Sequence, residues 1–171
     1  MRSTMYNAFG YTIQKDNHDK GHVEEVNVAT PFNKNVTIDT LDIYSKHNIR
    51  LVTSGNISVL HTNTGRVSSQ GPGWNNLDDL EPVGKYISTM IADTEIFFIF
   101  FDVNMVPIVP DVDIVHIPAN STKTFLQGQR IFLAAGTFTY SGVEVLGPRA
   151  VTFGSNKEVT ATSDCFMFNF K

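Results

Sequence analysis

The chain has 171 residues, a single cysteine and a formal net charge of −4. Its length suits one domain or one domain with arms, and a core of that size folds without disulfides or a structural metal. The acidic balance opposes generic binding to nucleic-acid backbones, and the longest apolar run, residues 96–101, is too short to cross a bilayer. We therefore expect neither a nucleic acid nor a membrane as a partner.

β-Branched and aromatic residues outnumber the strong helix formers, and turn residues separate short alternating segments along most of the chain. Many short strands with frequent turns indicate a sandwich or barrel. We predict an all-β protein, a β-sandwich of the jelly-roll type with at most one short helix. Because residues 1–22 are polar and irregular, we predict an N-terminal arm there and a single β-sandwich domain over residues 23–171.

The first clear pair of strands lies at residues 49–53 and 57–61. They flank a Ser-Gly-Asn turn at residues 54–56, which predicts a hairpin. Residues 68–76 then form the longest stretch without periodicity and contain Trp74, the sole tryptophan. A loop of that length is commonly functional or in contact with a neighbour.

Residues 79–91 admit two interpretations. Asp79 is placed to cap a helix, Pro82 suits its first turn, and the apolar residues that follow recur at helical spacing. Gly84 and the β-branched residues favour a strand instead. We favour the helix and keep the strand as the alternative.

Strands are predicted from residue 95 to the end of the chain. The run at residues 96–101 is continuously apolar, as expected for a strand covered on both faces, and Pro107 and Pro110 suit an edge or a connection between sheets. The later strands are predicted at residues 114–117, 130–134, 137–140, 143–146, 150–153, 159–162 and 165–170.

His18, His22 and Glu24 form the first group with ligand chemistry. Their spacing would place two imidazoles on one face of a helix. Gly21 and the polar surroundings oppose a helix, so we interpret the segment as a solvated or interface arm.

Asp111, Asp113 and His116 form the second group. The two aspartates alternate along a predicted strand, so their side chains share one face and offer oxygen ligands. They fall within residues 86–122, which contain five acidic residues and no Lys or Arg. We favour polar edge residues, or pairing with a basic patch of a neighbouring subunit, over calcium binding.

No serine or threonine lies in a nucleophile motif such as Gly-x-Ser-x-Gly. Two acids that meet only in space stay open as a glycosidase alternative. Cys165 lies among apolar residues and is interpreted as a buried structural thiol. We predict no catalytic residues, no cofactor and no enzyme activity.

Residues 117–125 resemble the second conserved stretch of cupins, in which a proline, a glycine and then a histidine introduce a strand of the jelly-roll barrel. Pro118 matches the proline, Asn120 replaces the glycine, and Lys123 stands where the histidine would be. The first cupin motif needs a His-x-His pair, and the chain has none. The resemblance therefore supports jelly-roll topology and opposes cupin metal chemistry.

The chain as a whole resembles small virion structural proteins of tailed bacteriophages. The shared features are a Ser/Thr/Asn-rich β-sandwich, few charges, a polar N-terminal arm and an aromatic C-terminal strand. This resemblance implies a non-enzymatic assembly protein, most similar to capsid decoration or cement proteins, synthesised in the host cytoplasm and located in the virion. A tail, baseplate or fibre component, a carbohydrate-binding β-sandwich and a cupin-like enzyme are the alternatives.

Assembly of this kind depends on protein interfaces. We expect a homo-oligomer, with a trimer favoured, bound to a major capsid protein or another virion protein. Glycan binding through Trp74 is a weaker alternative. The residues expected at interfaces are Tyr6, Phe9 and Tyr11 of the arm, Trp74 in its loop, and Pro107 and Pro110 at exposed edges.

Overall fold

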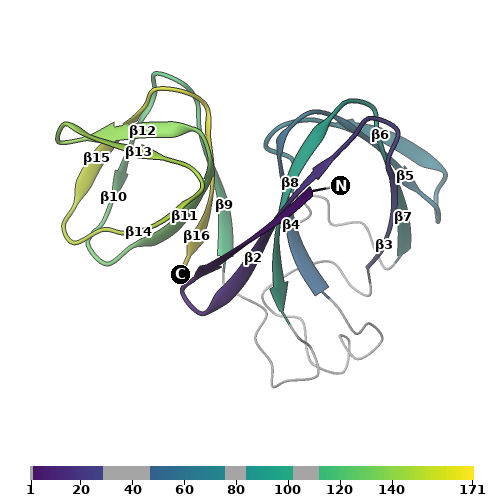
Figure 1. Cartoon of the computed structure of the whole chain (residues 1–171), viewed down its shortest axis with the longest axis horizontal. Coiled ribbons are helices and arrows are strands. Elements are labelled where there is room, and N and C mark those ends of the chain that lie inside the picture. Colours follow the sequence, from purple (N-terminus) through teal and green to yellow (C-terminus); the bar gives the residue numbers. More distant parts are fainter. Residues whose placement is uncertain (1, 29–46, 76–83, 102–111) are drawn as a thin grey trace. The chain divides into compact units, whose positions relative to one another are not determined.

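The computed structural model describes residues 2–28, 47–75, 84–101 and 112–171. The chain forms two compact units, Met1–Pro110 (unit 1) and Asp111–Lys171 (unit 2). Every regular element in the described residues is a β-strand, and all the strand pairings are antiparallel (Figure 1). The predicted all-β class is confirmed. None of these residues belongs to a helix long and apolar enough to span a membrane.

Unit 1 is built from two four-stranded sheets. Its strands are β1 (Arg2–Ala8), β2 (Tyr11–His18), β3 (Val23–Val28), β4 (His47–Ser54), β5 (Ile57–His61), β6 (Arg66–Gln70), β7 (Gly84–Met90) and β8 (Thr94–Phe101). The strand order is β1-β2-β8-β4 in one sheet and β3-β7-β5-β6 in the other.

Unit 2 also has two four-stranded sheets. Its strands are β9 (Val112–Ile117), β10 (Thr122–Phe125), β11 (Arg130–Ala135), β12 (Thr137–Tyr140), β13 (Val143–Leu146), β14 (Arg149–Thr152), β15 (Lys157–Ala161) and β16 (Cys165–Phe170). The strand order is β10-β15-β12-β13 in one sheet and β14-β11-β16-β9 in the other.

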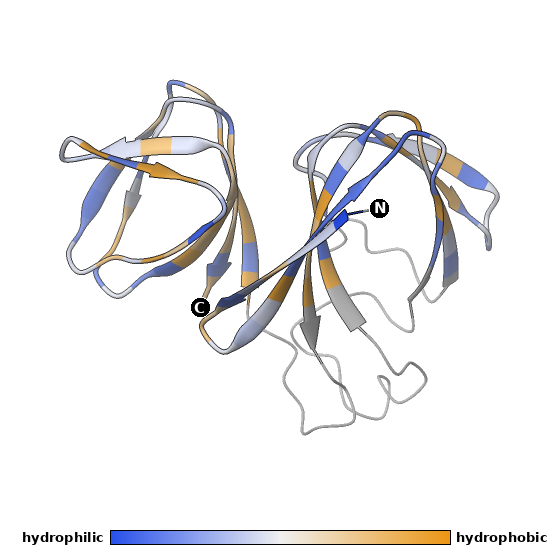
Figure 2. Cartoon of the chain, in the orientation of Figure 1, coloured by the Kyte–Doolittle hydropathy of each residue, from blue (hydrophilic) through white to orange (hydrophobic). Residues whose placement is uncertain are grey.

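Alternation along the strands supplies a core in each unit, and Figure 2 shows hydrophobic residues interspersed with hydrophilic ones along them. In β5, Ile57, Val59 and His61 are buried, whereas Ser58 and Leu60 between them are half-buried. The core of unit 1 contains Val52, Ile57, Val59, Met90, Ile96 and Phe98. That of unit 2 contains Ile117, Phe125, Ile131, Leu133, Phe138, Val145, Phe153, Val159, Ala161, Cys165 and Met167. Full burial of one such large side chain contributes about 1.5–3 kcal/mol.

The two units repeat one strand topology. The order β3-β7-β5-β6 corresponds to β10-β15-β12-β13, and β2-β8-β4 corresponds to β9-β16-β11. Both units bulge at the equivalent place, between Val52 and Ser54 in β4 and between Leu133 and Ala135 in β11. Each unit is therefore a small jelly roll, and positions in one can be matched to positions in the other by strand pairing.

A glycine carries the chain from one sheet to the other in both units. Gly55 (φ 87°) connects β4 to β5, and Gly136 (φ 97°) connects β11 to β12. A Cβ atom would collide with the Asp93 backbone at Gly55 and with the Asp164 backbone at Gly136. Because the strands around Gly55 belong to different sheets, the hairpin predicted at residues 54–56 is wrong.

Residues 2–18 form the paired strands β1 and β2, and β2 also pairs with β8. This differs from the predicted arm, because polar residues of β2 such as Asp16 and His18 are buried although their hydropathy predicted exposure. The structure also divides residues 23–171 between two units, where we predicted one domain.

The segment from Gly84 to Met90 is a strand, β7, which pairs with β3 on one side and β5 on the other. The favoured helix is wrong and the alternative, a strand, is correct. Backbone hydrogen bonds to strands on both sides of β7 outweigh the helical spacing of its apolar residues. Asp79 and Pro82 lie outside the described residues.

Candidate functional site

The turn between β2 and β3 brings three ligand-type side chains together. His18 ends β2, His22 directly precedes β3, and Glu24 is the second residue of β3. Gly21 (φ 92°) allows the tight turn, and its N–H donates a hydrogen bond to the carbonyl of Met90 at 2.7 Å. A turn between two strands thus achieves what the sequence suggested only for a helix, and the segment belongs to paired strands rather than to a solvated arm. The alternative of an interface stays a prediction.

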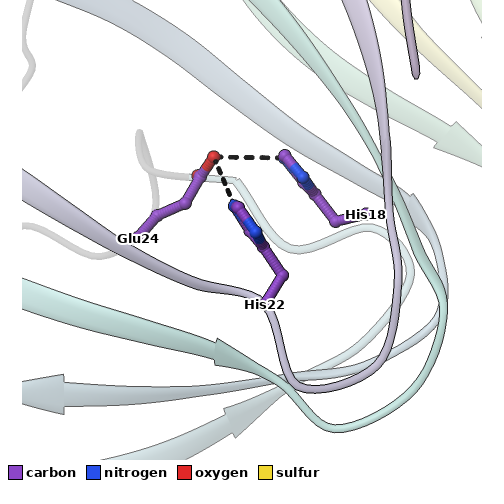
Figure 3. A group of neighbouring side chains, drawn as sticks. All are labelled: His18, His22 and Glu24. Atoms are coloured by element: carbon purple, nitrogen blue, oxygen red, sulfur yellow. Dashed lines mark hydrogen bonds and ion pairs between the residues drawn. The ribbon is translucent and has the colours of Figure 1, made fainter. Parts of the chain in front are cut away.

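The ligand atoms of these three side chains lie within 4.8 Å of one another. Glu24 Oε1 is 3.2 Å from His18 Nε2 and 3.3 Å from His22 Nε2. The two imidazoles are stacked, with ring centroids 4.2 Å apart and ring planes 5° apart (Figure 3). One carboxylate oxygen therefore faces two parallel rings. In the part of the chain that the structure describes, this is the one such group of His, Cys, Asp and Glu side chains.

His18 is the deepest member of the group, with 2% of its surface exposed. Neither of its ring nitrogens makes a hydrogen bond within the described residues. Burial lowers the pKa of His18 below its ordinary value, the carboxylate of Glu24 opposes this shift, and His22 reinforces it. The neutral imidazole is therefore favoured, and this is the form that binds metal ions.

Arg50 of β4 contacts the other oxygen of Glu24. Its Nη2 is 3.2 Å from Glu24 Oε2, and its guanidinium carbon lies 4.9 Å from the centroid of the Phe98 ring. Burial lowers the pKa of Arg50 and the ion pair with Glu24 opposes the shift, yet a guanidinium stays charged in proteins. Glu24 is thus held at both oxygens, by imidazoles at Oε1 and by a guanidinium at Oε2.

Asp16 places a second buried carboxylate beside His18. Its Oδ2 lies 3.8 Å from His18 Nε2, which is too long for a hydrogen bond but close enough for attraction. Its Oδ1 accepts hydrogen bonds from Ser3 Oγ (2.6 Å) and Gln14 Nε2 (2.8 Å). β1 and β2 together therefore fix this carboxylate.

Unit 2 builds the same turn without these groups. The Asn120 N–H donates to Ala161 O at 2.7 Å, just as Gly21 bonds to Met90 in unit 1. Strand pairing gives the equivalent positions in the two units. His18 corresponds to Ile117, His22 to Ser121, Glu24 to Lys123, Asp16 to Val115 and Arg50 to Ile131. The jelly roll therefore does not need buried polar groups at this corner, since Ile117 and Ile131 are core residues of unit 2.

The second predicted group is not assembled in the same way. Asp113 Oδ2 pairs with Lys171 Nζ at 2.8 Å, whereas His116 Nε2 is 3.6 Å from Asp164 Oδ1. Asp113 and His116 are three residues apart on β9, so their side chains point to opposite faces of the sheet. Asp111 lies outside the described residues.

Three residues predicted at interfaces lie in the β1–β2 hairpin. Tyr6 is on β1 and stacks on Phe97, with ring centroids 6.4 Å apart. Phe9 occupies the turn with a φ of 53°, and Tyr11 begins β2. All three are partly buried, and their role in an interface stays a prediction.

Trp74 packs against the core of unit 1, and its carbonyl accepts a hydrogen bond from the Val52 N–H at 2.9 Å. A half-buried indole held in this way has a packing role within the unit. Its predicted role in an interface is not tested by that packing. Pro107 and Pro110 lie outside the described residues.

Cys165 is fully buried, and its Sγ lies 3.3 Å from the carbonyl oxygens of both Thr137 and Ser163, which share its single S–H donor. Burial raises the pKa of the thiol to about 11, so the reactive thiolate is scarce at neutral pH. The prediction of a buried structural thiol is confirmed.

No protein-family model and no curated protein sequence matches the chain. Solved structures do share its fold. Ylba of Escherichia coli, a DUF861 protein, is 8% identical and matches over 98% of this chain and 81% of its own, with a TM-score of 0.51. A cupin 2 conserved barrel domain protein of Leptotrichia buccalis is 9% identical over 99% of this chain and 88% of its own (TM-score 0.46). A mutant of the Bacillus subtilis oxalate decarboxylase OxdC is 11% identical over 94% and 68% (TM-score 0.45).

These comparisons correct the predicted function. The chain shares its fold with Ylba, a DUF861 protein, so the assignment to bacteriophage virion proteins and the capsid decoration function are wrong, and the virion location is not supported. The prediction of a protein without enzyme activity is corrected as well. That prediction depends on the lack of a recognisable group of catalytic or metal-binding side chains. His18, His22 and Glu24 form such a group in the structure, so the prediction loses its basis.

Proposed function

We propose that unit 1 carries the metal centre of a cupin-type enzyme, in which His18, His22 and Glu24 bind one divalent transition-metal ion. The observation that carries the proposal is the convergence of two imidazole nitrogens and one carboxylate oxygen, in which one imidazole, that of His18, is buried and makes no hydrogen bond within the described residues. Leaving a buried polar group unsatisfied costs about 1–3 kcal/mol, and a metal ion bound to His18 Nε2 would remove this cost at that nitrogen.

The distances fit an ion between the three side chains. Two ligand atoms that each lie about 2.1 Å from one ion are roughly 3.0–3.4 Å apart in octahedral or tetrahedral coordination. The two distances from Glu24 Oε1 to the imidazole nitrogens, 3.2 and 3.3 Å, fall in this range. Two of the three pairs of ligand atoms therefore already have the spacing of ligands to one ion, and the two imidazole nitrogens lie within 4.8 Å of each other.

The donor set selects the class of metal. Imidazole suits iron, cobalt, nickel and zinc, whereas calcium and magnesium prefer oxygen ligands throughout. Two histidines and one carboxylate with open positions form the donor set of non-haem iron(II) oxygenases, so iron(II) is the first ion to test. A metal with open positions acts as a Lewis acid on an oxygen ligand, and open positions distinguish catalytic sites from closed structural ones.

A purely structural role is the competing explanation, in which the polar cluster stabilises the corner of the sandwich. Unit 2 argues against it, because Ile117 and Ile131 fill the places of His18 and Arg50 with apolar side chains. A buried charged network is also weak evidence for stability, since well-packed apolar replacements are often neutral or stabilising.

The test is titration of metal-free protein, prepared by dialysis against a chelator, with Co²⁺, Fe²⁺ under anaerobic conditions, and Ca²⁺. Calorimetry should give one site per chain for Co²⁺ and Fe²⁺ and no binding of Ca²⁺ at the same concentrations. The variants His18→Ile, His22→Ser and Glu24→Lys introduce the residues of unit 2. Each should weaken Co²⁺ binding by more than the roughly 10- to 100-fold that loss of an outer partner costs.

His116→Gln is the matched control, because it removes an exposed histidine that also pairs with a carboxylate. It should bind Co²⁺ as the unaltered chain does. Wild-type protein without stoichiometric metal binding, or equal losses in His116→Gln and His18→Ile, would refute the proposal.

A further inference from the structure

Arg50 lies directly behind the carboxylate of Glu24. It is 7% exposed, and it reaches Glu24 Oε2 at 3.2 Å from β4, in the other sheet of unit 1. The ring of Phe98, its neighbour across β4 and β8, lies 4.9 Å from the guanidinium carbon. A cation held by an ion pair and an aromatic face has little freedom to move.

The contacts divide the two oxygens of Glu24 between two tasks. Oε1 faces His18 and His22, and Oε2 faces Arg50. We propose that Arg50 is a positioning residue of the metal centre, which restricts Glu24 to one-oxygen coordination and aims Oε1 at the ion. This inference rests on the proposed function and adds a determinant of affinity and of metal choice.

The restriction matters because a glutamate side chain is flexible and its carboxylate can bind an ion through both oxygens. Ca²⁺ uses bidentate carboxylates and six to eight oxygen ligands, whereas first-row transition metals accept fewer ligands. With Oε2 engaged by Arg50, Glu24 offers a single oxygen. The site then favours a transition metal, and the carboxylate keeps its orientation in the absence of the ion.

Unit 2 lacks both the carboxylate and the arginine of this pair. The place of Glu24 is taken there by Lys123, and the place of Arg50 is taken by Ile131. The arginine is thus present in the unit that has the carboxylate ligand and absent in the unit that lacks it. A requirement of the fold for a cation at this position would have kept one in both units.

Two physical effects of Arg50 have opposite signs, and this makes the inference testable. A guanidinium near a divalent ion repels it, so loss of the charge alone would tighten metal binding. Loss of positioning would weaken binding, by about 10- to 100-fold for a typical outer partner of a metal ligand. We expect positioning to dominate, because Arg50 contacts Glu24 Oε2, whereas the imidazoles that would bind the ion face Oε1.

The experiment measures Co²⁺ affinity and the visible absorption spectrum of the Co²⁺ complex for Arg50→Met, Arg50→Lys and the unaltered chain. Arg50→Met should bind Co²⁺ about 10- to 100-fold more weakly and change the spectrum, because Glu24 is free to coordinate through both oxygens. Arg50→Lys keeps the charge and one donor and should lie between the two. Phe98→Leu removes the aromatic support alone and should have a smaller effect in the same direction.

Lys85→Met is the matched control, since Lys85 pairs with Glu25, the neighbour of Glu24, at 3.1 Å on the exposed face. It should change neither affinity nor spectrum. Tighter binding by Arg50→Met, or an unchanged affinity and spectrum in a folded Arg50→Met or Arg50→Lys protein, overturns the positioning role and leaves the metal site standing. Absence of binding by the unaltered chain overturns the proposed function itself, so the two failures are distinguishable.

Discussion

His18 of unit 1 and Ile117 of unit 2 occupy the same position in two copies of one topology. Each is the last residue of its strand, and each pairs with the first residue of the strand beside it, Thr94 of β8 for His18 and Cys165 of β16 for Ile117. One position therefore carries a buried imidazole in one unit and a core isoleucine in the other. This internal comparison separates what the fold requires from what unit 1 adds to it.

Transfer of the unit 2 residues into unit 1 should preserve the fold. The variant Asp16→Val, His18→Ile, Glu24→Lys and Arg50→Ile replaces the polar cluster by the residues at the equivalent positions. We expect a free energy of unfolding that is unchanged or higher by about 1–4 kcal/mol, because three of the four substitutions replace members of a buried ion network by apolar residues. Urea denaturation measures it, and added Co²⁺ should no longer raise the midpoint. A loss of several kcal/mol would show that the cluster holds the fold together.

The stability of the metal-free protein should depend on His18 below about pH 6.5. Burial lowers the pKa of His18 in the folded chain, so the unfolded chain takes up this proton at a higher pH than the folded chain does. Stability is then fully present above the unfolded pKa and decreases as the pH falls through the window between about 6.5 and the lower folded value. His18→Ile should flatten this part of the profile, measured by urea denaturation at a series of pH values. Identical slopes for both proteins would contradict the shift.

Cys165 should be unreactive in the folded protein. Its pKa of about 11 leaves little thiolate at pH 8, and the side chain is fully buried. Alkylation by iodoacetamide, followed by mass spectrometry, should label Cys165 within minutes in urea and far more slowly under native conditions. Equal rates in the two conditions would show an exposed or mobile thiol.

Gly136 and Gly128 provide a matched pair for the sheet crossing. Both have a positive φ, 97° and 84°, but a Cβ atom collides with the Asp164 backbone at Gly136 and meets nothing within 4 Å at Gly128. Gly128→Ala should cost about 1–2 kcal/mol for the strained backbone alone. Gly136→Ala should cost a further ~1–3 kcal/mol or more because the crossing has no room. Thermal denaturation compares them, and equal losses would refute the close approach.

The position of most strands was predictable from the sequence, because alternation and turn residues act over a few neighbouring residues. The strand over Cys165–Phe170 and its buried thiol are examples. The partner of each strand was not predictable in this way. The turn at Gly55 marks the end of β4 correctly, but β5 then pairs with β6 and β7 rather than with β4, and β7 is distant in the sequence.

The candidate site shows the same division. The pattern of His18, His22 and Glu24 was visible in the sequence, but the spacing was judged against a helix, although a turn between strands also joins these residues. Arg50 and Asp16 were missed, because no local pattern distinguishes a buried charge on a strand from an exposed one.

The sequence by itself determined the all-β class and the buried cysteine, because these properties follow from side-chain chemistry and local periodicity. Only the tertiary structure decided that the chain forms two jelly rolls and that one of them gathers two histidines, a glutamate and an arginine in its interior. The physical reason is that strand pairing and sheet packing join residues far apart in the chain, such as Glu24 and Arg50. Glu24 and Arg50 contribute to one candidate metal site only because the fold buries them and brings their charges into contact.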